Sequence, residues 1–141
     1  MLQGLPASGK STWAKNFCNK NTNFIRVNRD DIRSMCGKYW VPTREKYITK
    51  LEQFAVKEAL EMDYSVIIDA TNLNPKYSNW ITRIAEKYSV KLENMFFDTS
   101  VEECILRDKS RENPVGETVI MRMYNQHLKK NKNYETLISH F

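Results

Sequence analysis

The sequence is poor in the residues that build disulfide frameworks and metal centres. It has 3 cysteines and 2 histidines in 141 residues. The cysteines are far apart and have no C-x-x-C spacing, and the histidines have no metal-ligand spacing. We therefore interpret the cysteines as reduced intracellular thiols, and we expect a cytoplasmic protein without a metal held by protein side chains alone. These residues are Cys18, Cys36, Cys104, His127 and His140.

Long apolar runs and a strong charge imbalance are also missing. No run approaches the ~20 residues of a membrane span, and no secretory segment is visible, so we expect no membrane partner. Lysine and arginine total 22 and aspartate and glutamate 17, which gives 22 − 17 = +5. This mild excess favours a polyanionic partner without requiring one. The length suits one domain with one core.

Glycine is scarce as well, with 4 in the chain, and two of these fall in residues 4–11, which read GLPASGKS. The stretch fits the phosphate-binding pattern G-x-x-x-x-G-K-[ST]. Gly4 and Gly9 let backbone N–H groups surround a polyphosphate at positive φ. Lys10 would reach the β- and γ-phosphates, and the Ser11 hydroxyl would bind Mg²⁺. The predicted donor-binding residues of the loop are Gly4, Ser8, Gly9, Lys10, Ser11 and Thr12.

Polar residues follow the predicted strand at residues 24–27. In one interpretation Asn28 and Asp30 cap a short helix and Arg29 is solvated. In the other, Asp30 and Arg33 lie on one face of a helical turn, at the end of a parallel strand where ligands bind. A carboxylate beside a guanidinium would then serve as a base and a phosphate clamp. The residues alone leave both interpretations open.

The stretch 65–69 is the most strand-like in the chain, because it is a continuous β-branched run that ends in an acid. Asp69 is in the position of a Walker B residue and would hold a Mg²⁺-bound water. The alternative is that Asp69 or Asn74 only shapes the turn before the next helix, which Pro75 opens.

Two further groups of residues have a functional and a structural interpretation. Arg107 and Arg111 are four apart on a predicted helix, so they would form either a lid over the donor phosphates or a solvated charged surface. Tyr39 and Trp40 lie in a predicted loop, where they would either stack on a base or cover an edge of the core.

Strand and helix patterns alternate along the chain. Parallel strands need crossover helices, and the pattern supplies them. We therefore predict an α/β P-loop NTPase fold, with a parallel sheet of about four strands flanked by helices on both faces, like adenylate-kinase-type kinases. A P-loop strand normally has about five residues, and only three precede Gly4. Residues 1–141 are thus expected to form a single P-loop kinase domain, either a fragment or a module of a longer repair protein.

Together these motifs resemble the kinase domain of bacteriophage-type 5′-polynucleotide kinases and the wider family of polynucleotide-kinase-like P-loop phosphotransferases. The P-loop alone indicates only a nucleotide, whereas NRDDIR together with TNLNP is much more specific. The matching stretches are GLPASGKSTWA at 4–14, NRDDIR at 28–33, TNLNP at 71–75, FD at 97–98, and Arg107 with Arg111.

The resemblance implies a role for each matched residue. Asp30 would be the general base that activates a 5′-hydroxyl, and Arg33 would hold the phosphate on the 3′ side of the acceptor nucleotide. Lys10 and Ser11 would serve the triphosphate and its Mg²⁺, and Arg111, together with Arg107, would be the lid arginine. Asp69, Thr71 and Asn72 would complete the substrate site.

The sequence departs from the family pattern at two positions. The family has an acidic residue immediately before the threonine. In this sequence that position is Ala70, and the acidic residue is one position earlier, at Asp69. Either the strand has ended by then and Asp69 substitutes, or Asp69 takes the Walker B role and the family's role is unfilled. Ala7 stands where glycine is common, which we expect to be tolerable if φ is negative there.

The predicted function is transfer of the γ-phosphate of ATP, or of another NTP, to 5′-OH ends of RNA or DNA with Mg²⁺. Two alternatives are a small-molecule or nucleoside kinase on the same scaffold and a non-catalytic nucleotide-dependent switch or binding module. Fused or associated phosphatase or ligase modules are candidate partners that the sequence neither requires nor excludes. If the protein is phage-encoded, its location is the host cytoplasm.

Overall fold

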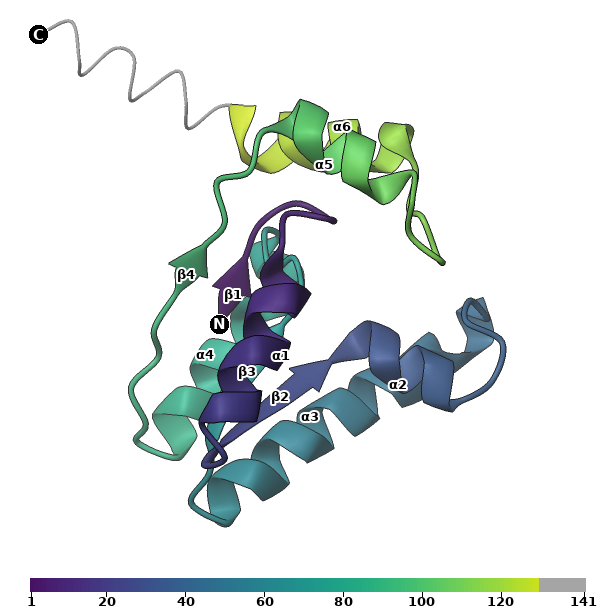
Figure 1. Ribbon diagram of the computed structural model, residues 1–141. Coiled ribbons are helices and arrows are strands. Elements are labelled where there is room, and N and C mark those ends of the chain that lie inside the picture. The colour runs from purple at the N-terminus through teal and green to yellow at the C-terminus, as the bar shows by residue number, and fades with distance from the viewer. Residues whose placement is uncertain (130–141) are drawn as a thin grey trace, which may run out of the picture.

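The computed structural model describes residues 1–129, so residues 130–141 of the predicted domain, including His140, lie outside the described part. Figure 1 shows the arrangement of the elements. In chain order they are β1 (Leu2–Gln3), α1 (Lys10–Lys20), β2 (Phe24–Asn28), α2 (Arg29–Met35), the 3₁₀ turn η1 (Pro42–Arg44), α3 (Glu45–Glu61), β3 (Ser65–Asp69), α4 (Pro75–Lys87), β4 (Met95–Phe96), α5 (Val101–Asp108) and α6 (Glu117–His127).

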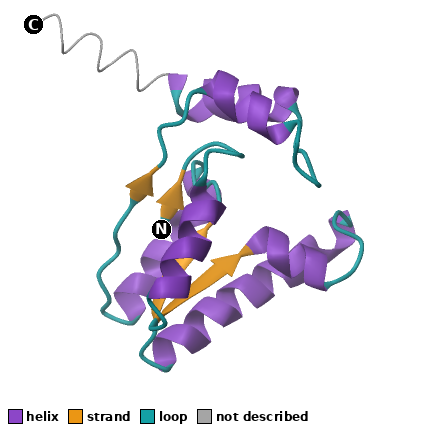
Figure 2. Ribbon diagram, viewed as in Figure 1, coloured by secondary structure: helices purple, strands orange, loops and turns teal. Residues whose placement is uncertain are grey.

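The strands form two parallel ladders, as Figure 2 shows in orange. β2 pairs with β3, with Phe24 opposite Ser65, and β1 pairs with β4. β1 also contacts β3, and just beyond it the Gly4 N–H donates to the carbonyl of Thr71 at 3.1 Å. These parallel strands, flanked by helices, confirm the predicted α/β P-loop kinase fold. The fourth strand is shorter than the pattern indicated, because only Met95–Phe96 form its ladder.

The side chains of β2 and β3 alternate between two apolar clusters, as expected for strands covered on both faces. Ile67 packs in one cluster with Ala14 of α1. Val27 and Ile68 pack in the other with Val56 of α3 and with α4. α1 therefore covers one face of this ladder, while α3 and α4 cover the opposite face.

A third apolar cluster joins α5 and α6 to the start of the P-loop. Leu5 is buried there with Val101, Cys104 and Ile120. In Figure 1 the α5–α6 pair lies beyond the end of the β4 segment, separate from the helices that cover β2 and β3. Contact with Leu5 places this pair beside the loop that the sequence assigns to phosphate binding.

Polar side chains cap three helix starts, and of the two caps that the sequence predicted for α2, Asn28 is confirmed whereas Asp30 lies inside the helix. Asn28 accepts the N–H of Asp31 at 2.9 Å and caps α2. Asn74 caps α4 with Pro75 in its first turn. Ser100 caps α5. Among these elements of residues 1–129, no helix is both long enough and apolar enough to cross a bilayer.

Candidate functional site

The P-loop backbone has the strained geometry that its glycines permit. Gly4 has φ +149° and Gly9 has φ +100°, as the motif predicted. A Cβ at Gly4 would lie 2.9 Å from Ser8 Oγ and 3.0 Å from the Phe97 carbonyl, so no side chain fits there. Ala7, however, has φ +61°, so the condition under which an alanine would be tolerated without strain is not met. The loop holds an alanine in the left-handed region, at a cost of about 1–2 kcal/mol.

Lys10 folds back into this loop. Its ammonium donates to the carbonyls of Gly4 at 3.0 Å and Leu5 at 2.6 Å, and to Ser8 Oγ at 3.1 Å. Burial lowers the pKa of Lys10 to about 8, and the charge of Asp69 partly opposes this shift. A buried cation held by uncharged oxygens in a loop rich in N–H groups is suited to receive a polyanion.

Asp69 is buried at the end of β3, with its side chain 1% exposed. Its Oδ2 accepts from Arg26 Nε at 2.8 Å and from Asn28 Nδ2 at 3.2 Å. Its Oδ1 has no hydrogen-bond partner among residues 1–129. Strand alternation places Asp69 on the same face as Ile67, the face that α1 covers. An orphaned buried carboxylate oxygen is costly unless a ligand satisfies it.

The oxygen atoms of Asp69 and Ser11 fit Mg²⁺, because this ion prefers oxygen ligands and retains several waters. Ser11 in the first turn of α1 and Asp69 Oδ1 are the residues that would hold it, Asp69 through a water. Among residues 1–129 there is no group of three or more His, Cys, Asp and Glu that could hold a metal by themselves. The ladder includes Asp69 and ends there, so Ala70 lies beyond it.

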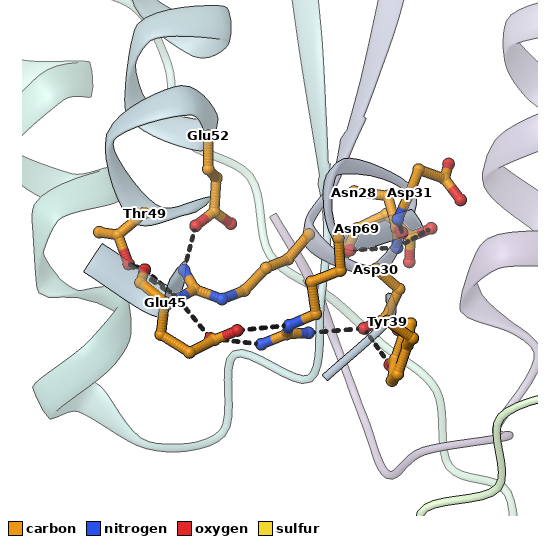
Figure 3. Close-up of polar contacts among 10 residues, drawn as sticks. Asn28, Asp30, Asp31, Tyr39, Glu45, Thr49, Glu52 and Asp69 are labelled. Atoms are coloured by element: carbon orange, nitrogen blue, oxygen red, sulfur yellow. Dashed lines mark hydrogen bonds and ion pairs between the residues drawn. The ribbon is translucent and has the colours of Figure 1, made fainter. Parts of the chain in front are cut away.

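Asp30 and Arg33 form a pair on α2, as the second interpretation predicted (Figure 3). Arg33 Nη1 donates to Asp30 Oδ1 at 2.6 Å, and the Tyr39 hydroxyl donates to the same oxygen at 2.7 Å. The Asp30 side chain is 42% exposed, so a second reactant has access to it. Burial, and then the bond to Asp30, raise the pKa of Tyr39 to about 12.

Hydrogen bonds between arginines of α2 and side chains of α3, which the sequence did not predict, support this pair. Glu45 of α3 accepts from Arg33 Nε at 2.9 Å and Nη2 at 2.8 Å. Arg29 donates to Glu52 at 2.8 Å and to Thr49 at 2.7 Å, so the interpretation of Arg29 as solvated was wrong. The bond from Arg33 lowers the pKa of Glu45 to about 2. Local spacing gives no signal for these contacts, because they join two helices.

The two halves of the site lie within electrostatic reach of each other. The charges of Asp30 and Arg111 both perturb the pKa of Lys10, in opposite directions. Arg111 also perturbs the pKa of Tyr39. Figure 1 shows the α2–α3 connection and the α5–α6 connection facing each other. Asp30 is therefore neither sealed inside the protein nor remote from the P-loop.

Of the two predicted lid arginines, Arg107 lies in the last turn of α5, whereas Arg111 lies in the turn that follows the end of α5 at Asp108, so the prediction that one helix carries both was wrong. Arg107 Nη1 lies 3.9 Å from the position that a Cβ at Gly9 would take, and Arg107 Nε donates to Glu103 at 2.7 Å. Arg111 Nη1 donates to Asp108 at 3.2 Å. The buried Asp108 carboxylate also accepts two backbone N–H groups, those of Val115 and Gly116. No local sequence pattern indicates these contacts, which fix the α5–α6 turn.

Thr71 and Asn72 hold the segment after β3 against β1. The Thr71 carbonyl accepts from Gly4, and Asn72 Nδ2 donates to the Leu2 carbonyl at 2.8 Å. Asn72 has φ +47°, in the left-handed region that Asn tolerates better than most residues. Thr12 is exposed on α1, next to Ser11. Direct substrate contact by Thr71, Asn72 or Thr12 stays a prediction.

Comparison with known proteins gives a family and several relatives. A family model described as an AAA domain matches residues 1–129. The L-seryl-tRNA(Sec) kinase of Methanococcus maripaludis is 30% identical over 128 residues, which cover 88% of this chain and 50% of that protein. The chain therefore spans about half the length of this curated relative.

Two solved structures are similar to the chain. A chain in the structure of a Pnkp1/Rnl/Hen1 complex is 37% identical, with a TM-score of 0.68, and the match covers 75% of this chain and 37% of that chain. A chain in the structure of the Pnkp1/Rnl/Hen1 RNA repair complex is 33% identical, with a TM-score of 0.79, and covers 94% and 44% respectively.

Proposed function

Since this chain belongs to the AAA domain family and has a P-loop kinase fold, we propose that it transfers the γ-phosphoryl group of ATP to the 5′-hydroxyl end of RNA or DNA. The observation that carries the proposal is the Asp30–Arg33 pair, in which the Asp30 side chain is 42% exposed and its charge acts on Lys10. A carboxylate beside a second anion clamp suits an acceptor that has both a hydroxyl and a phosphate.

On the donor side, Lys10 exchanges its loop carbonyls for the β- and γ-phosphate oxygens. This exchange replaces neutral acceptors with charged ones, which strengthens each hydrogen bond. Ser11, and Asp69 through a water, would hold Mg²⁺, which would neutralise part of the phosphate charge. Arg107, already beside Gly9, and Arg111 add guanidinium donors against the charge that spreads over the transferred group.

On the acceptor side, Asp30 takes the proton of the 5′-hydroxyl. The hydroxyl oxygen forms a bond to the γ-phosphorus while the bond to the bridging oxygen breaks and ADP leaves. Arg33 contacts Asp30 and Glu45 through one N–H on each of Nε, Nη1 and Nη2. A guanidinium has five N–H groups, so, counted over residues 1–129, one on Nη1 and one on Nη2 are left for the acceptor phosphate.

Substitution of the proposed base tests this assignment. Asp30→Ala is expected to lower kcat on a 5′-OH oligonucleotide by ~10²–10⁴-fold, because general-base assistance is lost, with ATP affinity unchanged. Radiolabel transfer from ATP measures the first and nucleotide titration the second. Asp31→Ala is the matched control, because Asp31 is adjacent and exposed and contacts Arg26 instead. Equal loss of ATP binding in Asp30→Ala would make Asp30 structural.

The second candidate is phosphorylation of another hydroxyl acceptor, since one relative is an L-seryl-tRNA(Sec) kinase. A panel of 5′-OH oligonucleotides, nucleosides and seryl-tRNA, each with ATP and Mg²⁺, separates the two. Transfer to seryl-tRNA or to nucleosides without transfer to 5′-OH ends would end the polynucleotide proposal. ATP hydrolysis without transfer to any acceptor would favour a switch module.

A further inference from the structure

One aromatic side chain next to the proposed acceptor site is largely exposed to solvent. Trp40 lies between α2 and η1 and is 54% exposed. Its ring lies 5.5 Å from the guanidinium carbon of Arg33. Neighbouring Tyr39 donates its hydroxyl to Asp30 and is half-buried. Of the two aromatic residues of this loop, only Trp40 presents a large free surface.

The loop that carries Trp40 is held in place and is basic. Arg44 Nη1 donates to the Cys36 carbonyl at 2.7 Å, which closes the loop at its base. Lys38 is exposed in the same loop. Arg33 is fixed by Glu45 and Asp30 independently of Trp40. An exposed indole 5.5 Å from a fixed guanidinium, in a loop that carries a further exposed cation, is a combination suited to single-stranded nucleic acid.

We propose that Trp40 is a stacking platform for a base of the acceptor strand on the 3′ side of the phosphate held by Arg33. This inference rests on the proposed function and adds a specificity to it. The acceptor is a single strand of at least two nucleotides, because the Trp40 ring lies 5.5 Å from the guanidinium carbon of Arg33, the residue proposed to hold the phosphate on the 3′ side of the first nucleotide. A nucleoside 3′-monophosphate would satisfy Arg33 but leave Trp40 without a partner.

A comparison of two acceptors tests the platform. Trp40→Ala is expected to raise the KM for a 5′-OH dinucleotide or longer strand by roughly 10- to 100-fold, in line with the contribution of one base–aromatic stack. The KM for a nucleoside 3′-monophosphate and the kcat for both acceptors stay at wild-type values. Trp40→Phe restores most of the affinity because it keeps a stacking face.

The matched control is Tyr77→Ala. Tyr77 is another exposed aromatic residue with a lysine near its ring, but it lies on α4, away from α2. It should leave both KM values unchanged. Titration with an oligonucleotide in the absence of ATP gives a second measurement. Addition of the oligonucleotide should change the tryptophan emission of the wild type. It should leave the emission of Trp40→Phe unchanged, because that variant retains only Trp13 and Trp80.

Failure of the inference is distinguishable from failure of the proposed function. If the wild type phosphorylates 5′-OH strands and Trp40→Ala has an unchanged dinucleotide KM, the platform is wrong and the kinase assignment stands. An equal rise in KM for both acceptors would mean that Trp40 only supports Arg33, which also overturns the platform. No transfer to any 5′-OH strand overturns the proposed function and the inference together.

Discussion

At the scale of single residues, the clearest effect of burial is on the pKa of Lys10. The loop removes its ammonium from water and offers two carbonyls and a hydroxyl in exchange. Desolvation disfavours the charged form, which is why the pKa of Lys10 falls from 10.5 to about 8. A polyphosphate that enters the loop favours the charged form again. Binding and protonation of Lys10 are therefore linked.

This linkage predicts that ATP binding at pH 9 takes up a large fraction of a proton. In the free protein Lys10 is mostly neutral above its pKa of about 8, and bound phosphates raise that pKa, while the phosphates of ATP are already ionised at pH 9. Calorimetric titrations in two buffers of different ionisation enthalpy measure the uptake. Lys15→Met, which removes an exposed lysine of α1, should retain it. Identical heats in both buffers would contradict the linkage.

At the scale of elements, α2 and α3 act as one unit because Glu45 bridges two arginines. It accepts from Arg33 through both oxygens and from Arg29 at 3.1 Å. The fixed fork of a guanidinium matches a carboxylate in this way. The contact orients Arg33 so that Nη1 meets Asp30. The position of the proposed base and clamp therefore depends on the first residue of α3.

The Glu45 bridge predicts how stability depends on acid. Its pKa is lowered from 4.5 to about 2 in the folded state. The contribution of the ionised Glu45 carboxylate to the free energy of unfolding is therefore fully present above pH 4.5 and is lost as the pH falls toward 2. Glu45→Gln should have lower stability at neutral pH and a flatter loss over that window, as measured by urea unfolding at several pH values.

Glu52 has the opposite effect on the pH dependence of stability, because burial raises the pKa of its carboxyl. The comparison therefore uses the difference between wild type and variant at each pH. Glu86→Gln, at an exposed position on α4, serves as the control and should keep the wild-type profile. A Glu45→Gln profile parallel to that of the wild type would show that the bridge does not set the acid sensitivity.

At the scale of the whole molecule, the chain has a sheet-centred part and a helical pair. α5 packs mainly against α6, and their apolar cluster reaches the rest of the molecule chiefly through Leu5 and Leu73. A hydrogen bond from Thr99 Oγ1 to the Ser8 carbonyl, 2.9 Å long, adds a polar link to the P-loop. Few buried contacts between parts favour local opening of the smaller one.

We therefore expect amide hydrogens of α5 to exchange faster than those of β3 in the free protein. ATP with Mg²⁺ should slow exchange in α5, because Arg107 and Arg111 would then contact the donor phosphates. Hydrogen exchange followed by mass spectrometry measures both effects, and Arg107→Gln together with Arg111→Gln should remove the second. Exchange in α5 as slow as in β3 without nucleotide would contradict the two-part description.

The sequence anticipated the features that depend on near neighbours in the chain. The P-loop glycines, the cap at Asn28, and the pairing of Asp30 with Arg33 all act over a few residues. Even so, local spacing leaves both interpretations of Asp30 open and does not determine the sign of φ at Ala7. The φ of Ala7 depends on how the whole loop closes over Lys10, which local propensity does not encode.

What the sequence by itself determined is the P-loop, the alternation of strands and helices, and the chemical types gathered after β2, β3 and β4. Spacing within one segment fixes these, because helices and strands have regular periods. Tertiary structure alone decided that Glu45 holds Arg33, that Asp108 fixes the α5–α6 turn, and that one Asp69 carboxylate oxygen has no hydrogen-bond partner within residues 1–129. Those features join segments far apart in the chain, and only packing of the elements brings such segments together.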